Sequence, residues 1–174
     1  MINVIFISGV HGVGKSYFCN QIKSEIGIET YTASELISAE KSEIFSENKL
    51  SKDIEDNQHY LLNAIQRLNS AVNKYLLDGH FCLLNSKGEI TRINLNTFIK
   101  LNPKAIILLT EKPEVIVERR KIRDGINCNI DEISQFQNAE ITYAKEVAKL
   151  LSVELKISRG VDDLNSVVDF VRNL

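Results

Sequence analysis

Short runs of apolar residues alternate with longer amphipathic stretches along this chain. Four segments, 2–8, 75–80, 105–110 and 153–158, are rich in leucine, isoleucine or valine and are too short for core helices. Segments of this kind are typical of strands buried in a parallel sheet. A further short strand is predicted at 28–32.

Between these strands, apolar residues recur every three or four positions, which is the spacing of one helix face. We expect helices at Lys15 to about Ile26, Thr32 to about Ile44, about Ile54 to Lys74, Pro113 to about Arg123, Asp131 to Leu151 and Asp162 to Val171. Thr32 and Glu35 form a capping box at the start of the second helix. Pro113 suits the first turn of the fourth helix.

Two segments interrupt this alternation. Residues 46–53 are polar and are expected to form a loop, whereas 81–93 carry a turn signal at 86–88 and are expected to form a hairpin-like excursion. Because strands otherwise alternate with helices, the sequence predicts an α/β fold with a parallel sheet and helices on both faces. The length of 174 residues fits a single domain, 1–174, at roughly 100–200 residues per domain.

A phosphate-binding motif follows the first predicted strand. Residues 9–16, GVHGVGKS, match G-x-x-x-x-G-K-[ST] at every fixed position and precede an amphipathic helix. Glycines allow backbone N–H groups to turn inward around a phosphate, and the helix N-terminus adds partial positive charge. We expect Lys15 to reach the β- and γ-phosphates of a nucleotide and Ser16 to place its hydroxyl on Mg²⁺.

A P-loop also needs an acidic residue on the Mg²⁺ side, usually at the end of a neighbouring apolar strand. Asp78 directly follows the apolar residues 75–77 and is the best candidate. Glu111, after 105–110, is the alternative. His11 and His80 lie close to these motifs and could contact a phosphate, although loop packing is the favoured role of His11.

A basic cluster lies at the end of the predicted helix that begins at Pro113. Three arginines and a lysine fall within 119–123, Gly125 then breaks the helix, and a polar segment follows. Phosphoryl transfer requires positive charge over the transferring group, and a lid can supply it. A solvated helix end with favourable cations is the competing interpretation.

Composition excludes several classes of protein. The formal net charge is -2, with 21 basic and 23 acidic residues, so bulk charge does not favour binding to nucleic acid. No apolar run approaches the ~20 residues that span a bilayer, and the N-terminus lacks the features of a signal peptide. Three scattered cysteines, Cys19, Cys82 and Cys128, argue against disulfides or a zinc site and favour the cytoplasm.

The order of these motifs resembles the archaeal-type adenylate kinases and the related eukaryotic nuclear nucleoside-monophosphate kinases. The resemblance rests on GVHGVGKS, LLDGH and AIILLTEKPEVIVERRKIRD, followed by a long helix and a final strand. It is tight at 2–16, fair at 75–125, loose at 131–158 and poor at 27–74.

The resemblance implies a P-loop NTPase fold with a five-stranded parallel sheet, and transfer of the ATP γ-phosphoryl group to a nucleoside monophosphate. It places an acceptor-binding insertion at about 32–74 and a short lid at about 119–130. The residues expected to hold ATP are Gly9, His11, Gly12, Val13, Gly14, Lys15, Ser16, Tyr17 and Arg119. The residues expected to act on Mg²⁺ or on the transferring group are Ser16, Asp78, Lys15, Arg119 and Arg123.

The acceptor region departs from this family. Such kinases usually hold the acceptor phosphate with arginines between the P-loop and the second acid, whereas residues 17–77 contain one arginine, Arg67. Lys41 could substitute, without bidentate recognition. Another acceptor, including a hydroxyl group with Asp78 as the base, therefore stays open. An ATP-hydrolysing switch protein is the alternative from a different class.

Overall fold

The computed structural model describes residues 3–44, 54–69, 72 and 74–174. Its main sheet contains five parallel strands in the order β2-β3-β1-β6-β7. In that order the strands are Glu29–Thr32, Lys74–Asp78, Asn3–Ser8, Ala105–Leu109 and Glu154–Ser158. The predicted α/β fold with a five-stranded parallel sheet is confirmed.

The central position of β1 sets the location of the site. Ile7 pairs with Asp78 of β3, and Ser8 pairs with Leu108 of β6. The carboxyl ends of these strands therefore meet at one edge of the sheet, where ligands of open α/β sheets bind. The segment 9–14 leaves β1 at this edge.

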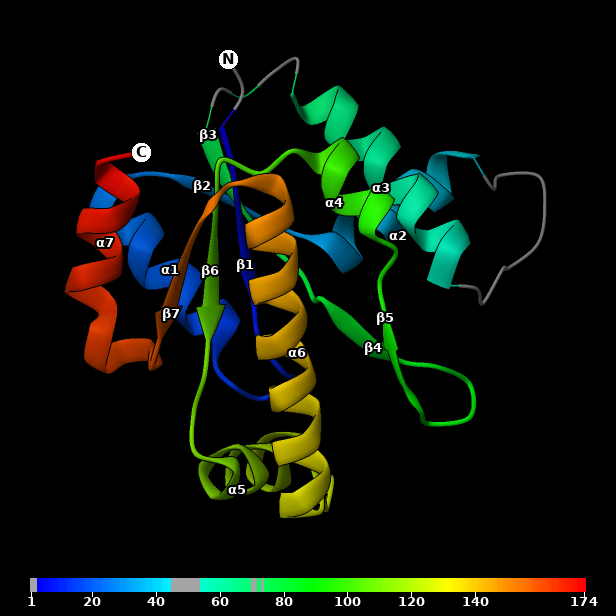
Figure 1. The fold of residues 1–174 in the computed structure, drawn as a ribbon, viewed down its shortest axis with the longest axis vertical. Coiled ribbons are helices and arrows are strands. Elements are labelled where there is room, and N and C mark those ends of the chain that lie inside the picture. The colour runs from blue at the N-terminus through cyan, green and yellow to red at the C-terminus, as the bar shows by residue number, and fades with distance from the viewer. Residues whose placement is uncertain (1–2, 45–53, 70–71, 73) are drawn as a thin grey trace.

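Helices cover both faces of the sheet (Figure 1). One face carries α1 (Lys15–Ile26) and α7 (Leu164–Arg172), which contact each other, and the 3-10 helix Gly160–Asp163 precedes α7. The long helix α6 (Ile130–Leu151) crosses the other face and contacts β6 and β7. Helix α5 (Pro113–Asp124) packs on α6 below the sheet in this view.

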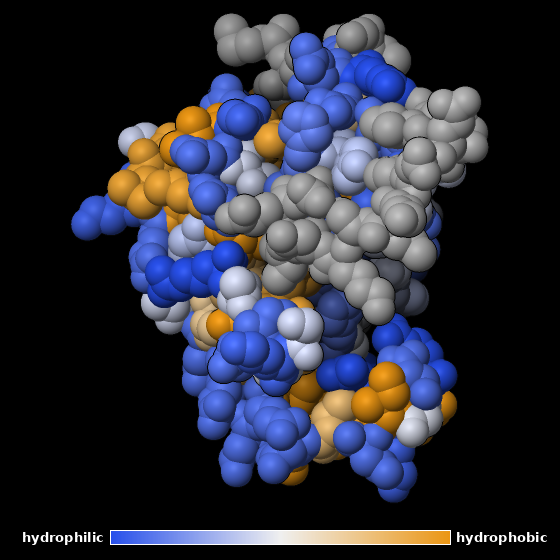
Figure 2. Space-filling view, turned by 90° about the vertical axis from the view of Figure 1, so that its right-hand side faces the viewer, coloured by the Kyte–Doolittle hydropathy of each residue, from blue (hydrophilic) through white to orange (hydrophobic). Residues whose placement is uncertain are grey.

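Three helices and a hairpin lie to one side of the sheet (Figure 1). Helix α2 (Ala33–Ile44) packs against α3 (Ile54–Leu68), which in turn contacts α4 (Leu95–Leu101). Strands β4 (Cys82–Leu84) and β5 (Ile90–Arg92) form an antiparallel hairpin. The described residues that show on this side are mostly hydrophilic, with apolar side chains exposed in a few clusters (Figure 2).

The core is continuous across the sheet, and an aromatic cluster anchors the segment after β3. The ring of Phe81 stacks on Phe98 with centroids 4.7 Å apart, and it meets Phe6 edge-on at 5.2 Å. Tyr143 of α6 closes the cluster at 6.0 Å from both Phe81 and Phe98. These contacts tie α4 and α6 to the turn that follows Asp78.

Most predicted elements are present, with two corrections. The helix expected at Ile54–Lys74 ends at Leu68, because Lys74 begins β3. Helix α4 was not expected from the sequence, although the Asn94 side chain caps it by accepting from Asn96 N at 2.9 Å. The loop expected at 46–53 lies outside the described residues.

Part of the predicted capping box is present. Glu35 N donates to Thr32 Oγ1 at 3.2 Å, which is one half of the predicted capping box. Cys19 and Cys82 are buried free thiols, and Cys128 is half-buried and free. Within the described part of the chain, no helix is both long and apolar enough to cross a membrane.

Candidate active site

The loop between β1 and α1 presents backbone N–H groups at the carboxyl edge of the sheet. Gly14 begins α1 with φ 104°, and no side chain caps this helix end. The first N–H groups of α1 therefore remain for a ligand. Gly12 has φ 88°, and a Cβ at this position would lie 2.6 Å from Cγ of Arg120. Only glycine allows this approach between the loop and α5.

Lys15 and Asp78 lie against each other beneath this loop. Lys15 Nζ donates to the Gly9 carbonyl at 2.8 Å and lies 3.7 Å from Asp78 Oδ1. Burial lowers the pKa of Lys15, whereas Asp78 and Glu140 oppose that shift. Burial raises the pKa of Asp78, and the ammonium of Lys15 opposes it. Each charge therefore depends on the other.

Glu111, the alternative second acid, faces a different partner. Its Oε2 accepts from Arg119 Nη2 at 3.2 Å, and its backbone exchanges hydrogen bonds with the Gln137 side chain. Of these two acids, Asp78 is the one that the structure brings to Lys15. Ser16, in the first turn of α1, lines the same cavity as both residues.

The three arginines in the basic segment after Pro113 make different kinds of contact. Arg119 Nη1 donates to the Val13 carbonyl at 3.1 Å, so this arginine holds the P-loop directly. Arg120 packs its aliphatic chain over Gly12. Arg123 lines the cavity, but its guanidinium makes two hydrogen bonds to Asp124, at 2.7 and 2.8 Å.

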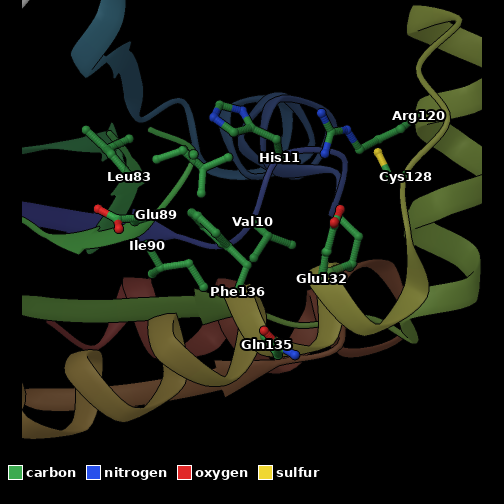
Figure 3. A pocket seen from close by; sticks show the side chains of 13 residues that line it. Val10, His11, Leu83, Glu89, Ile90, Arg120, Cys128, Glu132, Gln135 and Phe136 are labelled. Carbon is green, nitrogen blue, oxygen red and sulfur yellow. The ribbon is translucent and has the colours of Figure 1, made fainter. Parts of the chain in front are cut away.

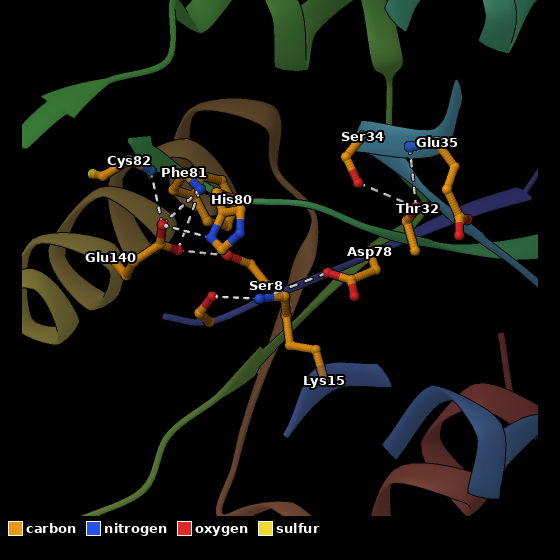
Figure 4. A network of polar contacts seen from close by, with 11 residues as sticks. Ser8, Lys15, Thr32, Ser34, Glu35, Asp78, His80, Phe81, Cys82 and Glu140 are labelled. Atoms are coloured by element: carbon orange, nitrogen blue, oxygen red, sulfur yellow. Dashed lines mark hydrogen bonds and ion pairs between the residues drawn. The ribbon is translucent and has the colours of Figure 1, made fainter. Parts of the chain in front are cut away.

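A buried carboxylate that sequence reasoning missed connects α6 to both sides of the site (Figure 4). Glu140 is 1% exposed and accepts from Ser8 Oγ at 2.5 Å. It also accepts from Phe81 N at 3.0 Å and from Cys82 N at 2.8 Å. Ser8 precedes the P-loop, and Phe81 and Cys82 follow Asp78. Glu140 therefore holds the end of β1, which leads to Lys15, next to the segment that follows Asp78.

The sequence contains a signal for this residue. Glu140 lies four positions after Phe136 and four before Ala144, both buried, so a charged residue interrupts the apolar face of α6. Buried carboxylates are rare unless they are hydrogen-bonded. Burial raises the pKa of Glu140, and the donors from Ser8, Cys82 and Phe81 oppose this shift.

Two histidines pack together beside the loop. The rings of His11 and His80 have centroids 4.3 Å apart. Burial and the nearby Lys15 lower the pKa of His80 to about 2 and that of His11 to about 4. Both imidazoles are therefore neutral near pH 7. His80 Nδ1 is buried without a hydrogen-bond partner, 3.8 Å from Glu140 Oε1. His59 is exposed.

A cavity of about 660 Å³ opens from Lys15, Ser16 and Asp78 toward α2, α3 and α4. A second cavity, of about 610 Å³, lies between the β4–β5 hairpin, α6 and the P-loop (Figure 3). His11 and Leu83 line both cavities, so the two spaces adjoin. The site thus joins a phosphate-binding loop to a space large enough for a small molecule.

Comparisons with known proteins identify the family and the fold. Residues 8–137 match the family described as AAA domain. No curated protein matches the chain. A gluconokinase from Sinorhizobium meliloti 1021 is 17% identical, with a TM-score of 0.57 over 98% of this chain and 94% of the gluconokinase.

Two further solved structures are similar over nearly their full lengths. Shikimate kinase from Bacteroides thetaiotaomicron is 14% identical, with a TM-score of 0.54 over 99% of this chain and 98% of the enzyme. TT1252 from Thermus thermophilus is 14% identical, with a TM-score of 0.57 over 99% of this chain and 97% of TT1252. Identities this low establish the fold alone. The chain belongs to the AAA domain family and has the fold of the P-loop kinases.

Proposed function

We propose that the chain is a small-molecule kinase that moves the γ-phosphoryl group of Mg-ATP to an acceptor bound in the 660 Å³ cavity. The observation that carries the proposal is the position of Lys15. Lys15 begins α1 at an uncapped helix N-terminus, its ammonium lies beside Asp78, and the residue lines that cavity. Membership of the AAA domain family and the likeness to two kinases support it.

In this proposal the donor nucleotide lies on the P-loop. Gly9, His11, Gly12, Val13, Gly14, Lys15, Ser16, Tyr17 and Arg119 hold its phosphates or their surroundings. The Ser16 hydroxyl and the Asp78 carboxylate supply oxygen ligands of the kind that Mg²⁺ prefers, and both line the same cavity, so the residues fit this ion. When bound, Mg²⁺ neutralises charge on the phosphates.

Three positively charged side chains have different roles in this proposal. Lys15 exchanges its hydrogen bond with the Gly9 carbonyl for one with a phosphate oxygen. Arg119 keeps the loop in place through Val13. Arg123 reaches the transferring group only when it releases Asp124, and this release is the expected motion of a lid at about 119–130.

The acceptor belongs to the region of about 32–74 together with α4. The resemblance to adenylate kinases favours a nucleoside monophosphate there. The names of the gluconokinase and the shikimate kinase favour an alcohol. Either acceptor suits transfer at Lys15, because both reactions depend on positioning and charge neutralisation.

Transfer of label from [γ-³²P]ATP tests the proposal, with Mg²⁺ and a panel of monophosphates, nucleosides, sugars and sugar acids. We expect a labelled product well above acceptor-free hydrolysis, and its loss in Lys15→Ala. Lys23→Ala is the matched control, because Lys23 lies on the same helix and pairs with Glu29 at the surface. ATP hydrolysis that no acceptor stimulates would replace the kinase with an ATPase switch.

A further inference from the structure

A buried amide lines the acceptor side of the cavity without a hydrogen-bond partner. Gln58 of α3 is 8% exposed, and its Oε1 makes no hydrogen bond in the structure. It lines the 660 Å³ cavity and the neighbouring 570 Å³ cavity that extends along α4. Buried polar atoms are normally paired, and an unpaired one reduces stability. Gln58 Oε1 can therefore accept a hydrogen bond from a ligand that occupies the cavity.

Several of the other polar residues around this cavity are uncharged. Away from the P-loop and the two histidines, they are Thr32, Ser34, Ser38, Asn57 and Thr97. Leu61, Phe98 and Ile93 form an apolar wall, and all three are buried. Hydroxyl and amide groups together with apolar side chains suit a carbon skeleton that carries several hydroxyl groups.

Two cations close to this side of the cavity, Lys41 and Arg67, already have partners. Lys41 Nζ donates to Asn57 Oδ1 at 2.5 Å and lies 5.5 Å from the centre of the Tyr60 ring. Arg67 pairs with the buried carboxylate of Glu40 at 3.2 Å. Among the described residues that line the cavity, the one arginine is Arg123, which pairs with Asp124. A phosphate on the acceptor would thus lack the bidentate guanidinium that suits it.

We infer that the acceptor is an uncharged molecule bearing hydroxyl groups, a neutral sugar, polyol or nucleoside, one hydroxyl of which donates to Gln58 Oε1. This inference rests on the proposed kinase function. In the reaction, the acceptor oxygen forms a bond to the γ-phosphorus, and the bond from that phosphorus to the bridging oxygen breaks. The bridging oxygen leaves with its electrons on ADP, and the hydroxyl proton ends on water.

An acceptor panel with four arms tests the inference. The arms are nucleosides, neutral sugars and polyols, the hydroxy acids gluconate and shikimate, and nucleoside monophosphates, each with Mg-[γ-³²P]ATP. We expect a labelled monophosphate ester from a neutral arm, at a rate at least about tenfold above acceptor-free hydrolysis. The nucleoside arm and the sugar arm distinguish the two sources of a neutral alcohol.

The remaining outcomes distinguish failure of the neutral-acceptor inference from failure of the proposed kinase function. A labelled nucleoside diphosphate, or an ester formed only from a hydroxy acid, overturns the neutral acceptor and leaves the kinase standing. Hydrolysis that no arm stimulates overturns both. Transfer to a neutral alcohol with an unchanged KM in Gln58→Leu overturns the contact with Gln58.

Variants of Gln58 supply a readout that a purely structural role would not produce. Gln58→Leu raises the KM for the alcohol by about 10- to 100-fold, because a buried ligand hydroxyl loses its acceptor, and leaves the KM for ATP unchanged. Gln58→Glu retains an acceptor oxygen and keeps the KM for the alcohol near that of the wild type. Gln66→Leu, on the exposed side of the same helix, is the matched control. Gln58→Leu also raises the melting temperature of the free protein, since it removes an unpaired buried atom.

Discussion

Lys15 Nζ lies 3.7 Å from Asp78 Oδ1, and the two side chains are only 8% and 12% exposed. Burial acts against both charges, as the lowered pKa of Lys15 and the raised pKa of Asp78 show. The ammonium also donates a hydrogen bond to the Gly9 carbonyl at 2.8 Å. The charge that the proposed reaction needs is thus kept in place by a carboxylate and a loop carbonyl.

Removing both charges should destabilise the protein by less than the sum of the two single removals. Lys15→Met and Asp78→Asn each leave an uncompensated buried group and should each lower the free energy of unfolding by roughly 1–3 kcal/mol. The double variant should recover at least about 1 kcal/mol of the summed loss. Urea unfolding of the four proteins measures this coupling, and strict additivity would show that the pair is not coupled. All three variants should lose phosphoryl transfer.

Gly12 should tolerate no side chain, because Arg120 occupies the space beside it. Gly12→Ala would place a methyl group 2.6 Å from Arg120 Cγ and should weaken binding of Mg-ATP by about tenfold or more. Gly88→Ala is the matched control: Gly88 also has a positive φ, 78°, but has open space around it. That control should cost only about 1 kcal/mol of stability. Calorimetric titration with Mg-ATP compares the two, and equal affinities would exclude the steric argument.

The local patterns in the sequence account for most of the fold. Three of these patterns involve only residues close in sequence: the apolar run before Gly9, the helical spacing after Lys15 and the apolar run that ends at Asp78. The corresponding elements β1, α1 and β3 are all present. The predicted end of α3 was wrong. Val72 continues the apolar spacing of the helix, but Lys74 pairs with β1 in the sheet. That pairing is a tertiary contact, which helical periodicity does not encode.

Site residues that belong to a sequence motif were predicted. Site residues that are brought together only by packing of the folded chain were missed. Asp78 could be chosen because an acid at a strand end lies at the edge where the P-loop begins. Glu140 contacts Ser8 across 132 positions of sequence, and no local pattern joins them. Gln58 was missed for the same reason, since its unpaired amide is a property of the folded cavity.

Glu140 should contribute more to stability than an exposed carboxylate on the same helix. Glu140→Ala leaves the N–H groups of Phe81 and Cys82 and the hydroxyl of Ser8 without their acceptor, so it should cost about 3 kcal/mol. Glu140→Gln keeps one acceptor oxygen and should cost about 1 kcal/mol. Glu146→Ala, which removes a surface pair with Arg92, should cost less than about 1 kcal/mol. Equal losses at positions 140 and 146, measured by denaturant unfolding, would contradict the buried network.

The same carboxyl group should give the protein a measurable dependence on pH. Because burial raises the pKa of Glu140 in the folded protein, the folded state holds a proton that the unfolded state releases near pH 4.5. The contribution of this group is therefore complete below pH 4.5 and is lost as the pH rises through the folded pKa. The slope approaches about 1.4 kcal/mol per pH unit at most.

Glu140→Gln isolates this effect, since glutamine does not titrate. Between pH 4 and pH 8, the free energy of unfolding of the wild type should fall relative to that of Glu140→Gln as the pH rises. Denaturant unfolding at a series of pH values measures the difference, in which the titration of every other group cancels to first order. A wild type that gains stability relative to the variant with rising pH would mean that the donors from Ser8, Phe81 and Cys82 outweigh burial and lower the pKa of Glu140.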